Sequence, residues 1–196
     1  MALENWSLQE LIKAGWSEDD LGWEMLTERM FAAAVDGDTD LAKAEAGEAL
    51  RLARESFEPI DPRLGTSFAN FGICLSLAGD KDALPSLVAK GLETWRSTMP
   101  WIARMQAPRV ARSSMFHLRM EVLHRDTYRA TWQKRWHEIA EDAARRLAAL
   151  SEGGAVTAPD HERLAAWGRE RPAMLNDTRK LLAAGSLLLA PPVAKS

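Results

Sequence analysis

Hydrophobic residues recur every three or four positions along most of the chain, which is the period of an amphipathic helix. The stretch 21–33 shows this period at Leu21, Met25, Leu26, Met30 and Ala33. A second stripe with the same spacing runs through Tyr128, Trp132, Trp136, Ile139, Ala143, Leu147 and Leu150. The alternating pattern of a half-buried strand is not found. We therefore predict an all-α fold.

Capping and turn residues divide this pattern into helices. Ser17 followed by Asp20 has the form of a capping box and predicts a helix that ends at the turn 36–38. A second helix is predicted over 39–57, a third from Pro62 to Ala78, and a fourth over 81–97. The Gly79–Asp80 turn repeats Gly37–Asp38 after 42 residues, so two helical hairpins of equal length follow one another.

The length of 196 residues suits one helical domain, 1–196. We expect two hairpins over 20–97 and a third helical pair over 98–150. After a glycine-containing loop, C-terminal helices over 159–190 would cap the array.

The stretch Thr66–Asp80 resembles the first helix and turn of a tetratricopeptide (TPR) repeat, especially the 42-residue variety found in kinesin light chains. The small residues that this family places at the helix contact, the turn and the second helix are matched by Gly72, Gly79 and Gly91. Ala42, Ala46 and Ala49 fit the second helix of the preceding repeat. The resemblance covers roughly residues 20–97. It implies antiparallel hairpins stacked as a short array, whose concave groove binds peptides or proteins and catalyses nothing.

The resemblance also aligns Asn70 with an asparagine on the inner face of such repeats. A side-chain amide can both donate to and accept from an extended peptide backbone, so Asn70 is a candidate binding residue. The alternative is a helix-face residue that is bonded to the neighbouring hairpin.

A basic segment interrupts an otherwise acidic protein. Residues 104–137 hold 8 basic and 2 acidic side chains, whereas 1–62 hold 5 basic and 15 acidic. Arg109, Arg112, Phe116 and Arg119 follow at helical intervals and would bind an acidic peptide or an anionic small molecule through guanidinium forks. The alternative is a solvated face, or one that pairs with the acidic half. A sequence pI of about 5.9 and the lack of a nucleic-acid-binding signature disfavour a nucleic-acid partner.

One helix face carries His117, Glu121 and His124, which are secondary candidates for a metal or acid–base site. One helix seldom supplies a whole site, and the metalloprotease spacing is absent. An ordinary polar face is the preferred interpretation, so we expect no metal, cofactor or catalytic residue. Cys74 lies in an apolar run and is predicted to be buried core.

The most apolar segment, 181–194, is shorter than the ~20 residues of a spanning helix, so no membrane span is expected. Its leucines, 187–189, would pack on their own helices or on a second copy of the chain. The first residues carry Glu4 and Glu10 and lack a secretory pattern, so we expect a cytoplasmic location.

Together these features predict a bacterial-type adaptor or regulatory protein that binds a protein or peptide in a TPR-like groove. The alternative is a helical enzyme or small-molecule sensor with an anion-binding pocket near the third helical pair.

Overall fold

The computed structural model describes residues 12, 16–103, 133–134, 136–154, 180, 183–184 and 186–187. The helices are α2 (Glu18–Asp36), α3 (Thr39–Ser56), α4 (Pro62–Leu77), α5 (Leu84–Ser97) and α6 (Met99–Ile102), and a further helix spans 136–151. No strand occurs in these ranges, and the predicted all-α class is confirmed. The TPR-like array and the C-terminal capping helices stay predictions.

Side-chain caps explain why three of the helices begin where they do. Ser17 and Asp20 form the predicted capping box of α2, with each side chain bonded to the other residue's backbone N–H at 3.1 and 2.9 Å. Asp38 accepts from the Leu41 N–H at the start of α3, and Asp61 accepts from the Arg63 N–H at the start of α4. Such caps satisfy backbone donors that have no partner within the helix.

The predicted start of the fourth helix at residue 81 was early by three positions. α5 begins at Leu84 without a side-chain cap, and a proline occupies its first turn. Because proline is tolerated in that turn but not in a helix interior, Pro85 favours a start close to its own position.

The two turns separated by 42 residues have the same backbone structure. Gly37 and Gly79 both have a positive φ, of 80° and 98°. Beyond each glycine, an aspartate N–H donates to a carbonyl five residues back: Asp38 to Ala33 and Asp80 to Leu75, both at 2.9 Å. This is the Schellman arrangement, which glycine permits because it has no Cβ. The sequence repeat thus corresponds to a structural repeat.

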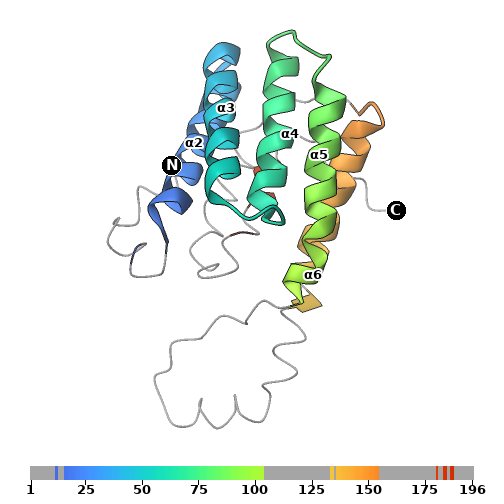
Figure 1. Ribbon diagram of the computed structural model, residues 1–196. Coiled ribbons are helices and arrows are strands. Elements are labelled where there is room, and N and C mark those ends of the chain that lie inside the picture. Colours follow the sequence, from blue (N-terminus) through green and yellow to red (C-terminus); the bar gives the residue numbers. More distant parts are fainter. Residues whose placement is uncertain are drawn as a thin grey trace, which may run out of the picture.

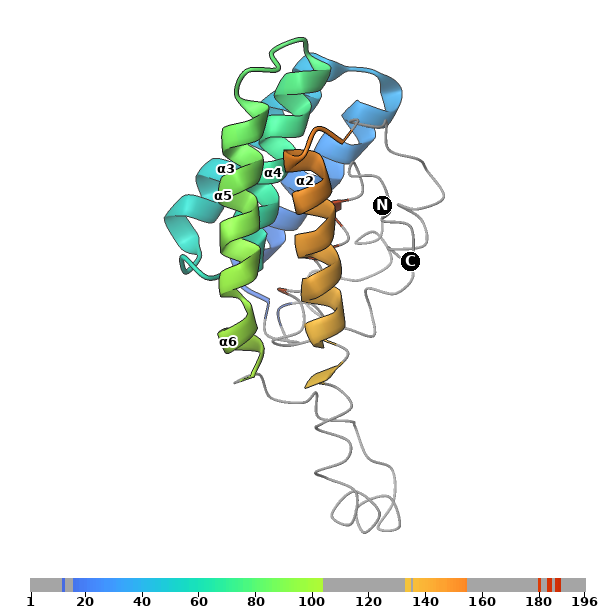
Figure 2. The ribbon, with the colours of Figure 1, turned by 90° about the vertical axis from the view of Figure 1, so that its right-hand side faces the viewer.

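Helices α2 to α5 run antiparallel and lie in chain order (Figure 1). α2 contacts α3, α3 contacts α4, and α4 contacts α5. The helix 136–151 lies along α5 and runs in the opposite direction to it, as the two views show (Figures 1 and 2). None of the helices in the described part of the chain combines the length and the apolar character that crossing a bilayer would require.

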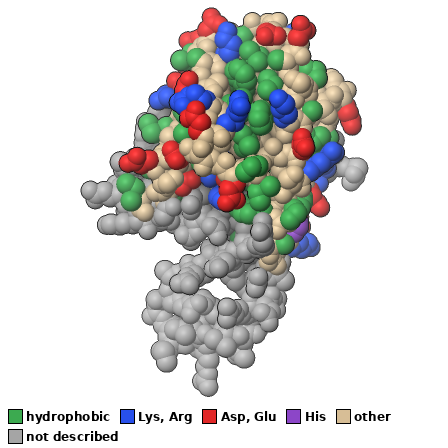
Figure 3. Space-filling view, in the orientation of Figure 1, with side chains coloured by type: hydrophobic (Ala, Val, Ile, Leu, Met, Phe, Trp, Pro, Cys, Tyr) green, Lys and Arg blue, Asp and Glu red, His purple; other side chains and the backbone are tan. Residues whose placement is uncertain are grey.

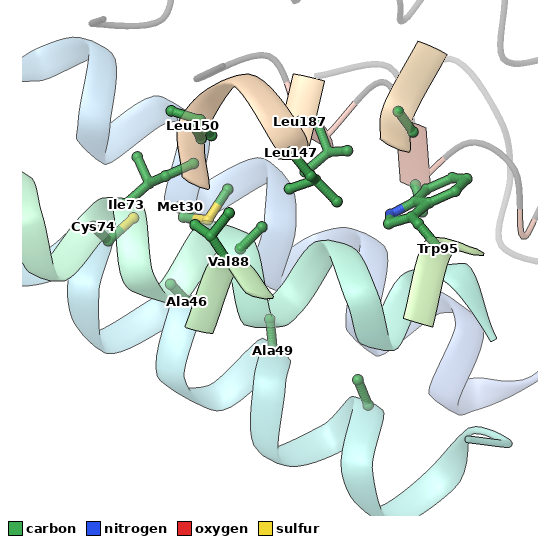
Figure 4. Close-up of a cluster of buried hydrophobic side chains, with 14 of the residues drawn as sticks. Met30, Ala46, Ala49, Ile73, Cys74, Val88, Trp95, Leu147, Leu150 and Leu187 are labelled. Atoms are coloured by element: carbon green, nitrogen blue, oxygen red, sulfur yellow. The ribbon is translucent and has the colours of Figure 1, made fainter. Parts of the chain in front are cut away.

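One continuous apolar core joins the helices. α3 contributes a row of buried alanines, Ala42, Ala46, Ala49 and Ala53. Trp136, Ala143, Leu147 and Leu150 of the predicted apolar stripe are buried in the same core. So is Leu187, the first of the three consecutive leucines 187–189 in the apolar C-terminal segment (Figure 4). That leucine packs on its own chain, as one of the two predicted alternatives states.

Glycines allow α4 and α5 to approach each other at two levels. A Cβ on Gly72 would lie 3.0 Å from the Leu87 Cβ, which confirms the close contact expected there. Gly91 of α5 faces Gly65 of α4, and a Cβ on Gly91 would lie 2.7 Å from the Gly65 carbonyl oxygen. The resemblance matches Gly91 to a small residue of the second helix, and in the structure this glycine lies at the contact between α4 and α5.

The outer surface of α3, α4 and α5 shows no dominant charge. Lys and Arg side chains are interspersed with Asp and Glu on this face, and hydrophobic side chains lie between them (Figure 3). Single apolar groups scattered among charges are usual on a folded surface, so the outer face is not a candidate site.

Candidate functional site

The face of α4 that points into the protein carries an unusual number of polar groups. Arg63, Thr66 and Asn70 follow one another at intervals of three and four, and Ile73 continues the row. Positions with this spacing lie on one side of a helix, and we call these four residues the inner stripe. All four are at most 4% exposed. Burying polar groups is costly unless each has a partner, so the partners decide what the stripe can do.

Arg63 is fully paired. Its guanidinium forms a fork with Asp61, with Nε to Oδ1 at 3.1 Å and Nη2 to Oδ2 at 2.8 Å, and Nη1 donates to Asp20 of α2. The Phe57 ring centroid lies 3.5 Å from its Cζ atom. Burial alone would lower the pKa of Arg63, but the hydrogen bonds and charges of Asp61 and Asp20 outweigh burial and raise it. Arg63 therefore stays charged and joins the start of α2 to the start of α4.

A second cation approaches Asp61. Lys180 Nζ lies 3.9 Å from Asp61 Oδ2 and 5.3 Å from the Trp101 ring centroid. The carboxylate of Asp61 thus faces both Arg63 and Lys180. Because these buried charges are already paired with one another, we assign the cluster a structural role.

Thr66 is the centre of a hydrogen-bond relay. The indole Nε1 of Trp95 in α5 donates to Thr66 Oγ1 at 3.1 Å, and that hydroxyl donates to the backbone carbonyl of Ala183 at 3.0 Å. Because Trp95 occupies an acceptor position of the hydroxyl, the hydroxyl proton is directed toward the carbonyl. The relay therefore presents a buried donor that binds a backbone carbonyl of a segment 117 residues away along the chain.

Ser67, beside Thr66, joins α4 to α2 in a similar way. Trp23 Nε1 donates to Ser67 Oγ at 2.8 Å, and the Ser67 hydroxyl donates to the Arg63 carbonyl at the same distance. Both of its roles are satisfied within the helical core. Ser67 is therefore a packing residue whose only proton is already donated within α4.

Asn70 differs from these neighbours. It is 3% exposed, and among the residues that the structure describes its side-chain oxygen Oδ1 has no hydrogen-bond partner. The predicted alternative, an amide bonded to the neighbouring hairpin, would supply a donor to that oxygen. An unpaired buried carbonyl costs about 1–3 kcal/mol, so its retention in the stripe calls for an explanation.

Cys74 follows Ile73 in α4 and is buried in the core, as predicted. It is completely buried, and burial raises the pKa of its thiol to about 12. A thiol that stays protonated is a poor nucleophile, so this end of α4 carries no covalent chemistry.

The other predicted sites lie outside the described residues. These are the binding candidates Arg109, Arg112, Phe116 and Arg119, and the metal candidates His117, Glu121 and His124. Within the described ranges, no three His, Cys, Asp or Glu side chains gather to hold a metal ion. Of the predicted site residues, only Asn70 lies within the described part of the chain.

Sequence reasoning missed Thr66, Trp95 and the Arg63 cluster. The available signal was the spacing of Arg63, Thr66 and Asn70 within a helix that is otherwise apolar or small. Polar residues on the buried side of a predicted helix mark either a satisfied network or a site. The distant partners at Asp20, Trp95 and Ala183 could not be read from local sequence.

Comparison with known proteins places the chain in no family: no family model, no curated protein and no solved structure matches it. The resemblance to TPR repeats therefore stays a prediction that rests on the residues quoted above.

Proposed function

We propose that the chain is a cytoplasmic adaptor or regulatory protein in which α2–α5 form a TPR-like array, and that a short segment of a protein partner binds on the inner stripe of α4. What supports the proposal most is the unpaired, buried Oδ1 of Asn70. A segment that places a backbone N–H or another donor against this oxygen removes the cost of leaving it unpaired.

The Thr66 relay adds a second recognition element. Its hydroxyl already donates to a backbone carbonyl, which every peptide can offer. Thr66 and Asn70 lie one helical turn apart and supply a donor and an acceptor, respectively. That pair suits the alternating polar groups of a peptide backbone better than it suits an isolated anion. The Arg109, Arg112, Phe116 and Arg119 set remains part of the proposal as a contact for an acidic partner.

The test is a selection of peptides from a random displayed library on the full chain, followed by affinity measurements on variants. Selected peptides should bind Asn70→Leu about tenfold more weakly than the wild type, because one hydrogen bond in a buried site is lost. Glu93→Ala is the matched control, since Glu93 is exposed on α5. Equal affinity for the wild type and Asn70→Leu, or selection of no peptide, would contradict the proposal.

A further inference from the structure

Three described residues of the segment 180–187 contact the inner stripe and its surroundings. Lys180 faces Asp61 and Trp101, the Ala183 carbonyl accepts from Thr66, and Leu187 enters the core. Ala183 and Leu187 are completely buried, and Ser186 is 3% exposed. The three contacts fall at the first, fourth and eighth residues of the segment. A charge, a backbone carbonyl and an apolar side chain are the features by which a peptide ligand is usually held.

The contacts follow α4 in a consistent order. Asp61 precedes the first turn of α4, and Thr66 lies about one turn further along. Leu187 is drawn next to Leu147, between Trp95, which bonds to Thr66, and Ile73, which lies two turns beyond Thr66 (Figure 4). The segment therefore runs in the same direction as α4. It occupies the face to which the proposed partner would bind.

This intramolecular fit is incomplete at one position. The segment satisfies Thr66 but leaves Asn70 Oδ1 without a donor. Its described residues 183–184 and 186–187 form short 3₁₀ turns, whose backbone hydrogen bonds have poorer geometry than those of an α-helix. A different segment that keeps the three contacts and adds a donor at Asn70 would bind the same stripe more tightly.

We propose that residues 180–187 are an intramolecular ligand that a partner displaces. The inference rests on the proposed function and names the partner's chemistry. Its binding segment carries a basic residue, a small residue three positions later, a leucine-like residue seven positions later, and a hydrogen-bond donor that reaches Asn70. While the intramolecular segment is bound, the apparent affinity for the partner is reduced by the fraction of chains in the closed form.

The first test uses the full chain and a fluorescein-labelled peptide of residues 178–188. Lys180→Ala combined with Leu187→Ala weakens the intramolecular ligand, so this variant should bind the peptide about tenfold or more tightly than the wild type. Adding Thr66→Val should weaken that binding about tenfold because one buried hydrogen bond is lost, whereas Thr66→Ser should retain it because the hydroxyl remains. A peptide carrying aspartate in place of its leucine at 187 is the control. Equal binding by the wild type and the weakened variant would overturn the inference.

The second test needs no substitution. Hydrogen exchange of the wild-type chain should show the backbone amides of 183–187 exchanging about tenfold or more faster than those of 66–73, because the segment separates while α4 stays folded. Exchange of both segments at one common rate would overturn the inference, since residues 180–187 would then leave only on global unfolding.

The two proposals fail in different ways. If library-selected peptides bind with an affinity that falls on Asn70→Leu, yet leave the exchange of 183–187 unchanged at saturation, the intramolecular-ligand inference is overturned and the proposed function stands. If no peptide of any sequence binds the wild type or the weakened variant, both are overturned. Faster exchange of 183–187 on addition of a selected peptide supports both.

Discussion

Helices α2 and α4 both bury polar side chains, but they satisfy them differently. In α2, Asp20 pairs with Arg63, the Thr27 hydroxyl donates to the Trp23 carbonyl at 2.8 Å, and Glu24 also takes part in an interaction. In α4, Thr66 and Ser67 are satisfied and Asn70 Oδ1 is not.

The difference separates two uses of buried polarity. A buried polar network in which every group is paired fixes the relative positions of the helices. The hydrogen bonds of the network offset the free-energy cost of removing its polar groups from water. The desolvation cost of a buried, unpaired acceptor is offset only when another molecule or segment supplies a hydrogen-bond donor. This contrast assigns the Asp20–Arg63 pair to the fold, and it supports the binding role that we propose for Asn70 of α4.

The largest expected effect breaks the link between the two helices. Arg63→Ala removes the cation that faces Asp20 and Asp61, and it leaves both carboxylates buried. Loss of one partner from a buried pair costs about 3–5 kcal/mol, so we expect a fall of that size in the free energy of unfolding in urea. A fall below about 1 kcal/mol, the size of an exposed ion pair, would show that solvent reaches the cluster.

The next effect tests how rigidly α5 holds α4. Gly91→Ala places a Cβ 2.7 Å from the Gly65 carbonyl oxygen, and a backbone atom cannot move aside as a flexible side chain does. We expect a loss of about 1–3 kcal/mol from overpacking.

Gly47→Ala on α3 is the matched control for that substitution. Its Cβ would meet only the Phe71 ring at 3.4 Å, an ordinary contact. Alanine is favoured over glycine within a helix, so this variant should be about 0.5–1 kcal/mol more stable than the wild type. If Gly91→Ala and Gly47→Ala changed the midpoint of thermal unfolding equally, the close contact between α4 and α5 at Gly91 would be contradicted.

A smaller, pH-dependent effect tests the burial of Cys74, which follows Ile73 of the inner stripe. The pKa of Cys74 rises from 9.0 to about 12 on folding, so the folded chain holds the proton more tightly than the unfolded chain. The resulting stabilisation is complete below pH 9 and declines as the pH rises toward 12.

The comparison for this effect is with Cys74→Ala, which has no thiol. Between about pH 8 and pH 10, the wild type should lose about 1 kcal/mol of unfolding free energy that this variant keeps. Parallel pH profiles for the two proteins would show that the thiol is not buried.

Local signals predicted the helices well and the site poorly. The bounds of α2 and α3 follow from Ser17, Gly37 and Asp38, whose bonds span only a few residues and can be read in sequence order. The contacts that build the site join residues far apart, such as Asp20 to Arg63 and Thr66 to Ala183, which are 43 and 117 positions apart. Such pairings depend on how the helices pack, and no local pattern encodes them.

Asn70 was found through the resemblance and not through its surroundings. Its type and position suggested an amide on an inner face, but the sequence could not show that Oδ1 lacks a donor. That fact depends on every group around it in the folded chain. The same limit applies to Thr66, which is an ordinary helical threonine until Trp95 and Ala183 are placed beside it.

The most direct measurement of the central claim is the free energy of unfolding of Asn70→Leu in urea, compared with that of the wild type. If Asn70 serves binding, an apolar side chain of similar size removes an unpaired buried acceptor, and stability should stay the same or rise by about 1 kcal/mol. If Asn70 holds the helices together, the same substitution should lower stability by about 1–3 kcal/mol, and that result would contradict the account.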